Sequence, residues 1–334
     1  MLDKPRMFLH VGTHKTGTTS FQSLLSKNRM SLEDVGILYP DPSTYFGGSA
    51  KVHHAVAHAL TETRPSEIET NEAFLAAVHH QALRSGAVVV LSTESLYGHI
   101  HGKRRWGSDQ DVARYWRLRR RYVESAAKYL SNFSVTCQVA LRRPDRYIES
   151  YYGERVVKSL VAESFAKWRE RFSVLCDYST QIDLLRSAFA DVRVHRYEDA
   201  RGGIENELIR DYGLAPGTLG PSIRSRPSAD ARVLLWFRIA QPGSWTLRRD
   251  FAASPEVRNS LPQYGRSTLW SQRQAQRAYN SQFSGDFGKR YFGRRYREDR
   301  FPAVLDDSSA QEINAAWTAW KASIAARHPI EAQS

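Results

Sequence analysis

The sequence predicts an α/β fold in which helices flank a central parallel β-sheet, followed by a mainly helical C-terminal part. Short apolar runs at residues 7–11 and 87–91 have the length of buried strands. Segments with helical spacing of apolar residues separate such runs, and strands that alternate with helices favour a parallel sheet covered on both faces. Beyond residue 216 the pattern is mostly helix and loop.

The expected elements follow one another regularly along the chain. Residues 7–11 form the first strand, which ends at Gly12, and Phe21, Leu24 and Leu25 then follow at helical spacing. Further helices are expected over residues 66–85, 111–130, 147–157, 179–190 and 204–212, and further strands over residues 87–91, 133–141 and 192–195.

The length of 334 residues is compatible with one elaborated domain. We expect a single domain over residues 1–334, with an α/β core over residues 6–213 and a helical, loop-rich region over residues 214–334. The Pro/Ser/Arg-rich stretch 221–227 is the expected hinge or mobile loop.

Composition excludes several classes of protein. Only Cys137 and Cys176 are present, so a disulfide framework is excluded and a reducing compartment is expected. No segment reaches eighteen consecutive apolar residues, and the N-terminus is wrongly flanked for a secretory signal. We therefore expect a cytoplasmic protein without a transmembrane segment, for which peripheral membrane contact stays open. Lys and Arg outnumber Asp and Glu by 48 to 35, and the net charge of +13 favours an anionic ligand.

A Gly/Thr-rich segment between the first strand and the first helix predicts a phosphate site. Gly12 and Gly17 keep the G-x-x-x-x-G spacing of a nucleotide P-loop, where backbone N–H groups and the positive end of the helix dipole converge. The segment departs from the nucleoside triphosphatase pattern, because Thr18 stands where the lysine belongs and Lys15 precedes the second glycine. The predicted sheet is therefore P-loop-like.

The run Lys15-Thr16-Gly17-Thr18-Thr19 resembles the 5′-phosphosulfate loop of the superfamily of sulfotransferases that use 3′-phosphoadenosine 5′-phosphosulfate (PAPS), which reads K-[ST]-G-T-[TS] after the first strand. The longer segment HVGTHKTGTTSFQ is similar to a bacterial, carbohydrate-type branch of that family. The resemblance implies that PAPS is bound by His14, Lys15, Thr16, Gly17, Thr18, Thr19 and Ser20.

Two further motifs carry the resemblance. Arg142 ends a strand in Arg-Arg-Pro, and Ser150 follows eight positions later, as in the family's 3′-phosphate site. Tyr197 lies in a Tyr-Glu-Asp segment that resembles the one near the family's adenine. The plainer alternatives are a surface ion pair for Arg142 and a core position for Tyr197.

The implied reaction is an in-line transfer of a sulfonate group from PAPS to a hydroxyl of a carbohydrate-like acceptor, with anionic glycans included. Catalysis would rest on positioning and charge neutralisation, and no metal is expected. Lys15 would stabilise the leaving group. Glu94, which follows the strand at residues 87–91, is the expected general base, with His53 and His54 as alternatives. The region 214–334 would contribute to the acceptor site.

Two other functions stay open. A P-loop-type nucleotide-dependent kinase would need a lysine directly after Gly17 and an acidic metal ligand. A basic nucleic-acid or polyanion-binding protein with a degenerate loop could use the clusters at residues 114–121 and 289–295. On a helix, however, the arginines of the first cluster spread around the cylinder, so no nucleic-acid partner is expected. The acceptor and the oligomeric state are not determined by the sequence.

Overall fold

The protein is described from a computed structural model. The described residues are 4–13, 16–46, 56–57, 65–98, 109–159, 168–169, 172–200 and 202–221. The chain divides into two compact units, one formed by Met1–Arg143 with Val174–Ser225 and the other by Pro144–Ser173 with Arg226–Ser334. The expected helical region 214–334 lies almost wholly outside the described residues, and the single domain stays a prediction.

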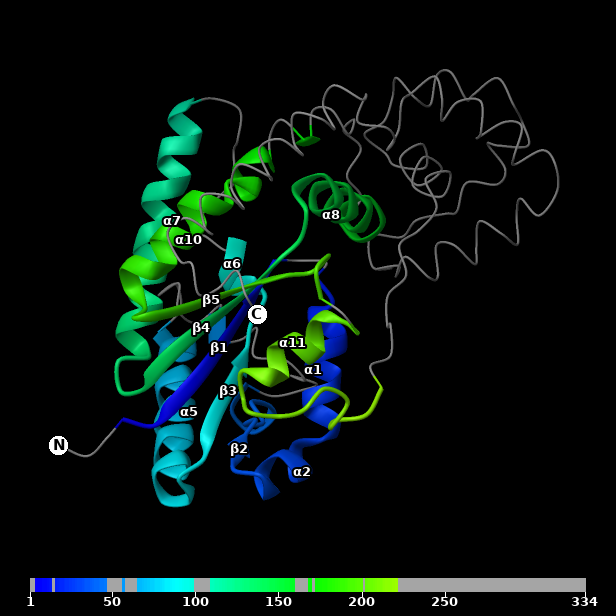
Figure 1. Cartoon of the computed structure of the whole chain (residues 1–334). Helices are drawn as coiled ribbons and strands as arrows, with labels where there is room; N and C mark the ends of the chain where they lie inside the picture. The colour runs from blue at the N-terminus through cyan, green and yellow to red at the C-terminus, as the bar shows by residue number, and fades with distance from the viewer. Residues whose placement is uncertain are drawn as a thin grey trace, which may run out of the picture. The chain divides into compact units, whose positions relative to one another are not determined.

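The first unit contains the predicted sheet, which is parallel throughout its described strands (Figure 1). The strand order is β2-β3-β1-β4-β5, so β1 is central, between β3 and β4. The strands are β1 (Arg6–Gly12), β2 (Ile37–Leu38), β3 (Val88–Ser92), β4 (Ser134–Leu141) and β5 (Asp191–Arg196). The α/β class predicted from the sequence is confirmed, with β1 carrying the glycine-rich segment at its carboxyl end.

Helices flank the sheet on both faces (Figure 1). Those of the first unit are α1 (Thr18–Lys27), α2 (Arg29–Asp34), α3 (Ser43–Phe46), α5 (Pro65–Ser85), α6 (Ser95–Gly98), α7 (Asp109–Tyr129), α10 (Tyr178–Ala188) and α11 (Ile204–Arg210). The second unit includes α8 (Pro144–Ser159), and a 3₁₀ turn covers Ser173–Cys176. Sequence reasoning found the long elements but missed β2, α2, α3 and α6, which are too short to show a period.

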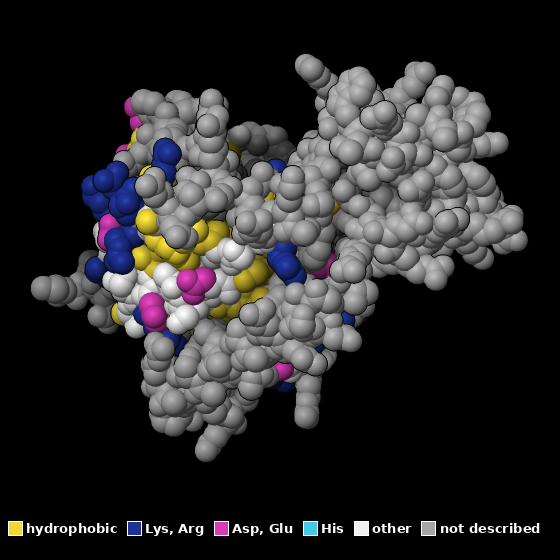
Figure 2. All heavy atoms as spheres, turned by 90° about the horizontal axis from the view of Figure 1, so that it is seen from above, with side chains coloured by type: hydrophobic (Ala, Val, Ile, Leu, Met, Phe, Trp, Pro, Cys, Tyr) yellow, Lys and Arg dark blue, Asp and Glu magenta, His cyan; other side chains and the backbone are white. Residues whose placement is uncertain are grey.

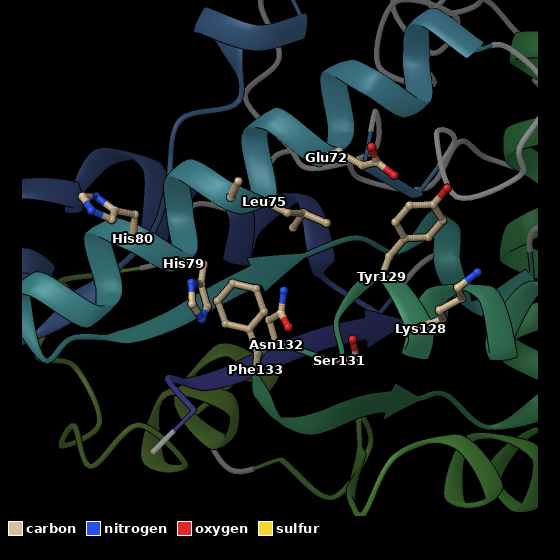
Figure 3. Close-up of a pocket in the computed structure, with 10 residues that line it drawn as sticks. Glu72, Leu75, His79, His80, Lys128, Tyr129, Ser131, Asn132 and Phe133 are labelled. Carbon is tan, nitrogen blue, oxygen red and sulfur yellow. The ribbon is translucent and has the colours of Figure 1, made fainter. Parts of the chain in front are cut away.

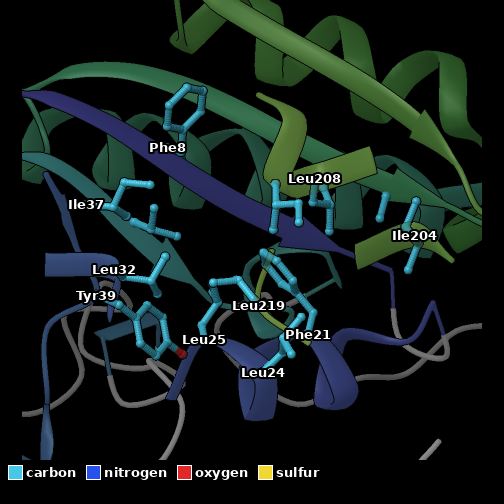
Figure 4. Packing of buried hydrophobic residues seen from close by; sticks show 13 residues of the cluster. Phe8, Phe21, Leu24, Leu25, Leu32, Ile37, Tyr39, Ile204, Leu208 and Leu219 are labelled. Atoms are coloured by element: carbon cyan, nitrogen blue, oxygen red, sulfur yellow. The ribbon is translucent and has the colours of Figure 1, made fainter. Parts of the chain in front are cut away.

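One face of the sheet is packed with apolar side chains from α1, α2 and α11 (Figure 4). Phe8 and Val90 point to this face from β1 and β3, and Phe21 and Leu25 reach them from α1. Side chains alternate between the faces of a strand, so Met7 and Leu9 belong to the opposite face, on the side of α5, α7 and α10. The core therefore holds α1 against the sheet, directly beyond the glycine-rich segment.

The face beneath α11 also carries a polar network. Asp211, just after α11, accepts hydrogen bonds from Gln138 Nε2 at 2.5 Å and Arg193 Nη1 at 3.0 Å, and its Oδ2 lies 2.9 Å from His195 Nε2. Tyr212 Oη lies 2.8 Å from Gln138 Oε1 and donates to it. Burial alone would raise the pKa of Asp211, but these partners overcome it and hold the pKa below its ordinary value.

This network contributes stability above the ordinary carboxyl pKa of about 4, and the contribution is lost as the pH falls through the lowered pKa of the folded state. Asp211→Asn should therefore lower the free energy of unfolding at pH 7 by about 1–3 kcal/mol, because charged hydrogen bonds are lost in a half-buried site. Urea unfolding between pH 3 and 7 measures this loss. The free energy of unfolding of the variant should also fall less toward pH 3 than that of the wild type.

The matched control is Asp199→Asn, which breaks the exposed pair of Asp199 with Arg196 at 2.7 Å. Its cost should stay within about 0.5 kcal/mol, because solvent screens such pairs. Equal losses of unfolding free energy in the two variants would show that the Asp211 network stabilises the fold no more than an exposed ion pair does.

Candidate functional site

The segment after β1 leaves the sheet in a closely packed turn. Thr13 N–H and Thr13 Oγ1 both donate to the carbonyl of Ala140, at 3.0 and 3.1 Å, and Thr16 Oγ1 donates to the carbonyl of Thr13 at 2.7 Å. Gly12 has no room for a side chain, since a Cβ there would overlap the methyl group of Thr18. The start of α1 is therefore pressed against the end of β1.

Gly17 stands at the N-cap of α1 with a φ of 77°, in the left-handed region that favours glycine. A Cβ there would lie 3.1 Å from Ile204 and 3.6 Å from the ring of Tyr197. The first N–H groups of a helix have no partner within the helix. At α1 no side chain caps them and no acidic residue occupies the first turn, so this end of the helix suits an anion.

The first turn of α1 is joined to the end of β3 by one hydrogen bond. Thr18 is buried, and its Oγ1 donates to Oε2 of Glu94. Glu94 directly precedes α6 and follows Ser92, the last residue of β3, by two positions. The Glu94 carboxylate thus lies at the carboxyl edge of the sheet, beside Thr18 of the predicted phosphate loop. The role of Glu94 as a general base stays a prediction.

Two more of the predicted site residues, Arg142 and Tyr197, lie against each other. The guanidinium of Arg142 lies over the ring of Tyr197, with its central carbon 5.2 Å from the ring centroid. Arg142 Nε is 3.8 Å from Glu198 Oε1, and Glu198 Oε2 accepts the backbone N–H of Arg143 at 3.0 Å. Because Tyr197 also borders Gly17, the loop glycine, the tyrosine and the strand-end arginine lie in one row.

A pocket of about 720 Å³ opens beside this row. Gly17, Ser20 and Tyr197 form one part of its lining, and the glycine-rich segments around Gly203 and Gly217 form another. Its volume falls in the range of small-molecule sites. Tyr197 packs against the core cluster and also lines the pocket, and its place beside an adenine stays a prediction.

Several of the predicted site residues do not lie together within the described part of the first unit. His14, Lys15, His53 and His54 lie outside the described residues, as does the basic cluster 289–295. Ser150 lies in α8, which belongs to the second unit. Its Oγ is buried without a hydrogen-bond partner, which is compatible with a ligand contact. Thr19 is part of the first turn of α1 and half-buried.

His10 is the residue of this region that sequence reasoning missed. It lies in β1, is completely buried, and its Nδ1 is 2.8 Å from Ser92 Oγ. Burial lowers the pKa of His10 to about 3, although the charge of Glu94 raises it, and His195 lowers it further. The available signal was a single histidine inside an otherwise apolar strand.

The basic cluster 114–121 lies on α7. Arg114, Arg117, Arg120 and Arg121 are exposed, whereas Arg119 is fully buried and donates to Gln181 Oε1 at 3.1 Å. Figure 2 shows Lys and Arg side chains gathered on the side of the molecule where Figure 1 places α7. The cluster thus combines a solvated face with one structural arginine.

A second pocket, of about 500 Å³, lies between the middle of α5 and the turn from α7 into β4 (Figure 3). Leu75 and Phe133 are its buried apolar residues, and the ring of His79 meets that of Phe133 edge-on at 5.3 Å. Lys128 and Ser131 lie beside the start of β4. The phosphate loop follows the opposite end of the parallel strands, so this pocket is separate from the site described above.

The described part of the chain offers neither a membrane span nor a metal cluster. None of its helices is long and apolar enough to cross a membrane. Within the same residues, no group of three or more His, Cys, Asp or Glu side chains could hold a metal ion.

No protein-family model and no curated protein matches the sequence. Among solved structures, the chain is similar to the crystal structure of a sulfotransferase from Alicyclobacillus acidocaldarius. The two are 16% identical, the match covers 75% of this chain and 91% of that chain, and the TM-score is 0.39. At that TM-score the likeness carries no argument about activity.

The role of Gly17 can be tested against Gly36, which has the same φ of 77° but open space within 4 Å of where its Cβ would stand. Both Gly→Ala variants should lose about 1–2 kcal/mol through left-handed strain. Gly17→Ala should lose more, because its Cβ would crowd Ile204. If the turn holds a nucleotide, as the sequence predicts, Gly17→Ala should also weaken its binding, whereas Gly36→Ala should leave it unchanged. Urea unfolding and calorimetry measure the two effects, and identical behaviour of the variants would contradict the close approach at Gly17.

Proposed function

We propose that this chain is a sulfotransferase that transfers a sulfonate group from PAPS to a hydroxyl of a carbohydrate-like acceptor. The observation that carries the proposal is the row formed by Gly17, Tyr197 and Arg142. These residues come from three motifs far apart in the sequence, each of which resembles a part of a PAPS site. Their contact in one unit supports the view that the motifs serve one ligand.

The residues fit the parts of PAPS by their chemistry. The start of α1, with its uncapped N–H groups, would hold the 5′-phosphosulfate group. The adenine would occupy the pocket beside Tyr197, whose aromatic ring can stack on a nucleobase. Arg142 would take the 3′-phosphate, for which a guanidinium is a strong partner. An arginine already held over an aromatic ring supports this assignment. The part of Ser150 in binding this phosphate stays a prediction.

In the proposed reaction, the acceptor oxygen forms a bond to sulfur while the bond from sulfur to the bridging oxygen breaks. The hydroxyl proton passes to Glu94, and the leaving group departs as 3′-phosphoadenosine 5′-phosphate. The position of Glu94 at the carboxyl edge of the sheet, where it accepts a hydrogen bond from Thr18, supports this role. The N–H groups of α1 would stabilise the charge that develops on the departing phosphate, as would Lys15.

The acceptor class is proposed from charge. The chain has a net charge of +13, and α7 presents four exposed arginines. Such a field raises the local concentration of anionic molecules. An acidic glycan is therefore the acceptor that we favour, and the protein would act in the cytoplasm.

Donor choice tests the proposal. The protein should bind 3′-phosphoadenosine 5′-phosphate more tightly than ADP, because Arg142 would pair with a 3′-phosphate that ADP lacks. Arg142→Ala should weaken the bisphosphate by about 1.5–3 kcal/mol, the range for a charged hydrogen bond, and leave ADP unchanged. Isothermal calorimetry measures both ligands.

Two matched variants sharpen this test. Glu198→Gln removes the carboxylate that competes for Arg142, so the bisphosphate should bind at least as tightly. Arg196→Ala changes an arginine already paired with Asp199 and should leave both ligands unaffected. Equal affinity of the wild type for ADP and the bisphosphate would overturn the proposal.

The base is tested with Glu94→Gln, which keeps the shape of the side chain and can still accept from Thr18. The turnover of PAPS should fall by roughly 10²–10⁴, the range for loss of acid–base catalysis. The affinity for the bisphosphate should stay near that of the wild type. His53→Ala and His54→Ala are the controls, and a larger loss in either, with Glu94→Gln active, would transfer the role to that histidine.

A further inference from the structure

The pocket beside Tyr197 has a buried carboxylate in its lining. Glu205 is the second residue of α11, and 9% of its surface is exposed. Both Glu205 and Gly203, which directly precedes α11, line the pocket. A Cβ on Gly203 would lie 2.8 Å from Glu205 Oε2 and 3.6 Å from Glu205 Oε1. The carboxylate itself, and not only the backbone of Glu205, therefore lies against this part of the pocket wall.

The carboxylate of Glu205 makes neither a hydrogen bond nor an ion pair with any other described residue. The polar side chains next to it are engaged. The side-chain amide of Asn206 bonds two backbone groups, at 2.7 and 3.1 Å, and Glu207 is paired with Arg210 at 2.7 Å. Buried polar groups are as a rule hydrogen-bonded, so Glu205 has the capacity to accept hydrogen bonds from a ligand.

The two helices that border the pocket begin with opposite electrostatic character. The start of α1 has no capping side chain and no acidic residue in its first turn, which suits an anion. The first turn of α11 carries Glu205 and Glu207, which repel one. The two starts are neighbours, because a Cβ on Gly17 would lie 3.1 Å from Ile204. A ligand that fills the pocket should therefore be anionic in one part and present hydrogen-bond donors in another.

The chemistry of a carboxylate restricts the group that can face Glu205. An ionised carboxylate only accepts hydrogen bonds, so the ligand has to present an N–H or O–H group. The adenine proposed for this pocket has such a group in its 6-amino nitrogen. A purine with an oxo group at the same position would turn an acceptor toward an acceptor. A site built on such a hydrogen bond rejects the analogue that lacks the donor, because the site's buried acceptor is then left unpaired.

We propose that Glu205 is a specificity-determining residue, whose carboxylate accepts a hydrogen bond from the 6-amino group of adenine and so selects adenine over purines with a 6-oxo group. The inference rests on the proposed function and deepens it. The start of α1 would bind the 5′-phosphosulfate, and the start of α11 would read the base in the same pocket. Selection of the base is thus assigned to a residue outside the three sequence motifs.

Calorimetry with nucleoside 3′,5′-bisphosphates tests this role without any acceptor. The purine riboside form lacks only the 6-amino group of the adenosine form, and the inosine form carries an oxo group in its place. The wild-type protein should bind the purine riboside form roughly 10-fold more weakly than the adenosine form, as expected for the loss of a hydrogen bond to a charged group. The inosine form should bind more weakly still, because its oxo group meets the carboxylate.

Two variants of Glu205 should change this order in different ways. The amide oxygen of Glu205→Gln still accepts from the 6-amino group, and its N–H₂ can donate to a 6-oxo group, so the adenosine and inosine forms should bind within about 3-fold of each other. Glu205→Leu should bind the adenosine and purine riboside forms equally. The matched control is Glu207→Gln, which changes an acid already paired with Arg210 and should keep the wild-type order.

Equal affinity of the wild type for the adenosine and purine riboside forms would overturn the inference. Rejection of the inosine form that persists in Glu205→Gln would do the same, since another group would then select the base. So would a guanosine form that binds as tightly as the adenosine form, because the N1–H and 2-amino groups of guanine can also donate to a carboxylate.

A last comparison separates the base from the ribose. If Glu205→Leu erases the loss caused by a 2′-deoxy form and not the loss caused by removal of the amino group, the carboxylate holds the ribose and the inference is wrong. If the wild type binds no bisphosphate, the proposed function has failed and the inference fails with it. Tight binding of the adenosine form without preference for its amino group contradicts the inference alone.

Discussion

The close approach of Thr18 to Gly12 is the constraint on which the rest of the site depends. Because no Cβ fits at Gly12, the first turn of α1 can lie directly against the end of β1. This contact brings the Thr18 hydroxyl to Glu94 after β3 and directs the uncapped N–H groups of the helix toward the carboxyl edge of the sheet. The apolar packing of Phe21 and Leu25 then keeps α1 in this position. A side chain at Gly12 would separate all three elements.

The two faces of the sheet are both apolar but differ in the buried polar residues that their strands carry. The face that includes Met7, Leu9 and Val139 is apolar, and burial of such side chains contributes about 1.5–3 kcal/mol each. The opposite face carries His10 and Gln138 among its apolar side chains, and buried polar groups are tolerated only where hydrogen bonds satisfy them. Gln138 is fully engaged with α11 and the residues that follow it. Apolar burial on both faces thus offsets the cost of holding polar groups beside the site.

The sequence was sufficient for the α/β class with its parallel sheet and for the position of the loop, because both have local signatures. The apolar runs in β1 and β3 have strand length, and the spacing of Gly12 and Gly17 is typical of a turn from a strand into a helix. The row from Gly17 to Arg142 became visible only with the fold, since the order of the strands decides which strand ends are neighbours. His10 was missed for a related reason. One polar residue in an apolar strand has no partner in the sequence, and Ser92 lies 82 positions away.

Under the proposed function, the surroundings of Arg142 would keep its side chain ordered before the 3′-phosphate binds. Its ion pair with Glu198 spans 3.8 Å, which is longer than the 2.7–2.9 Å typical of a charge-assisted hydrogen bond. The pair is thus weak enough to be replaced, while the ring of Tyr197 fixes the plane of the guanidinium. A phosphate that displaced Glu198 would meet an arginine whose side-chain freedom had already been reduced, and less ordering would be required on binding. The same carboxylate would oppose an anion that cannot displace it, so under the proposed function Glu198 would add selectivity where Arg142 would add affinity.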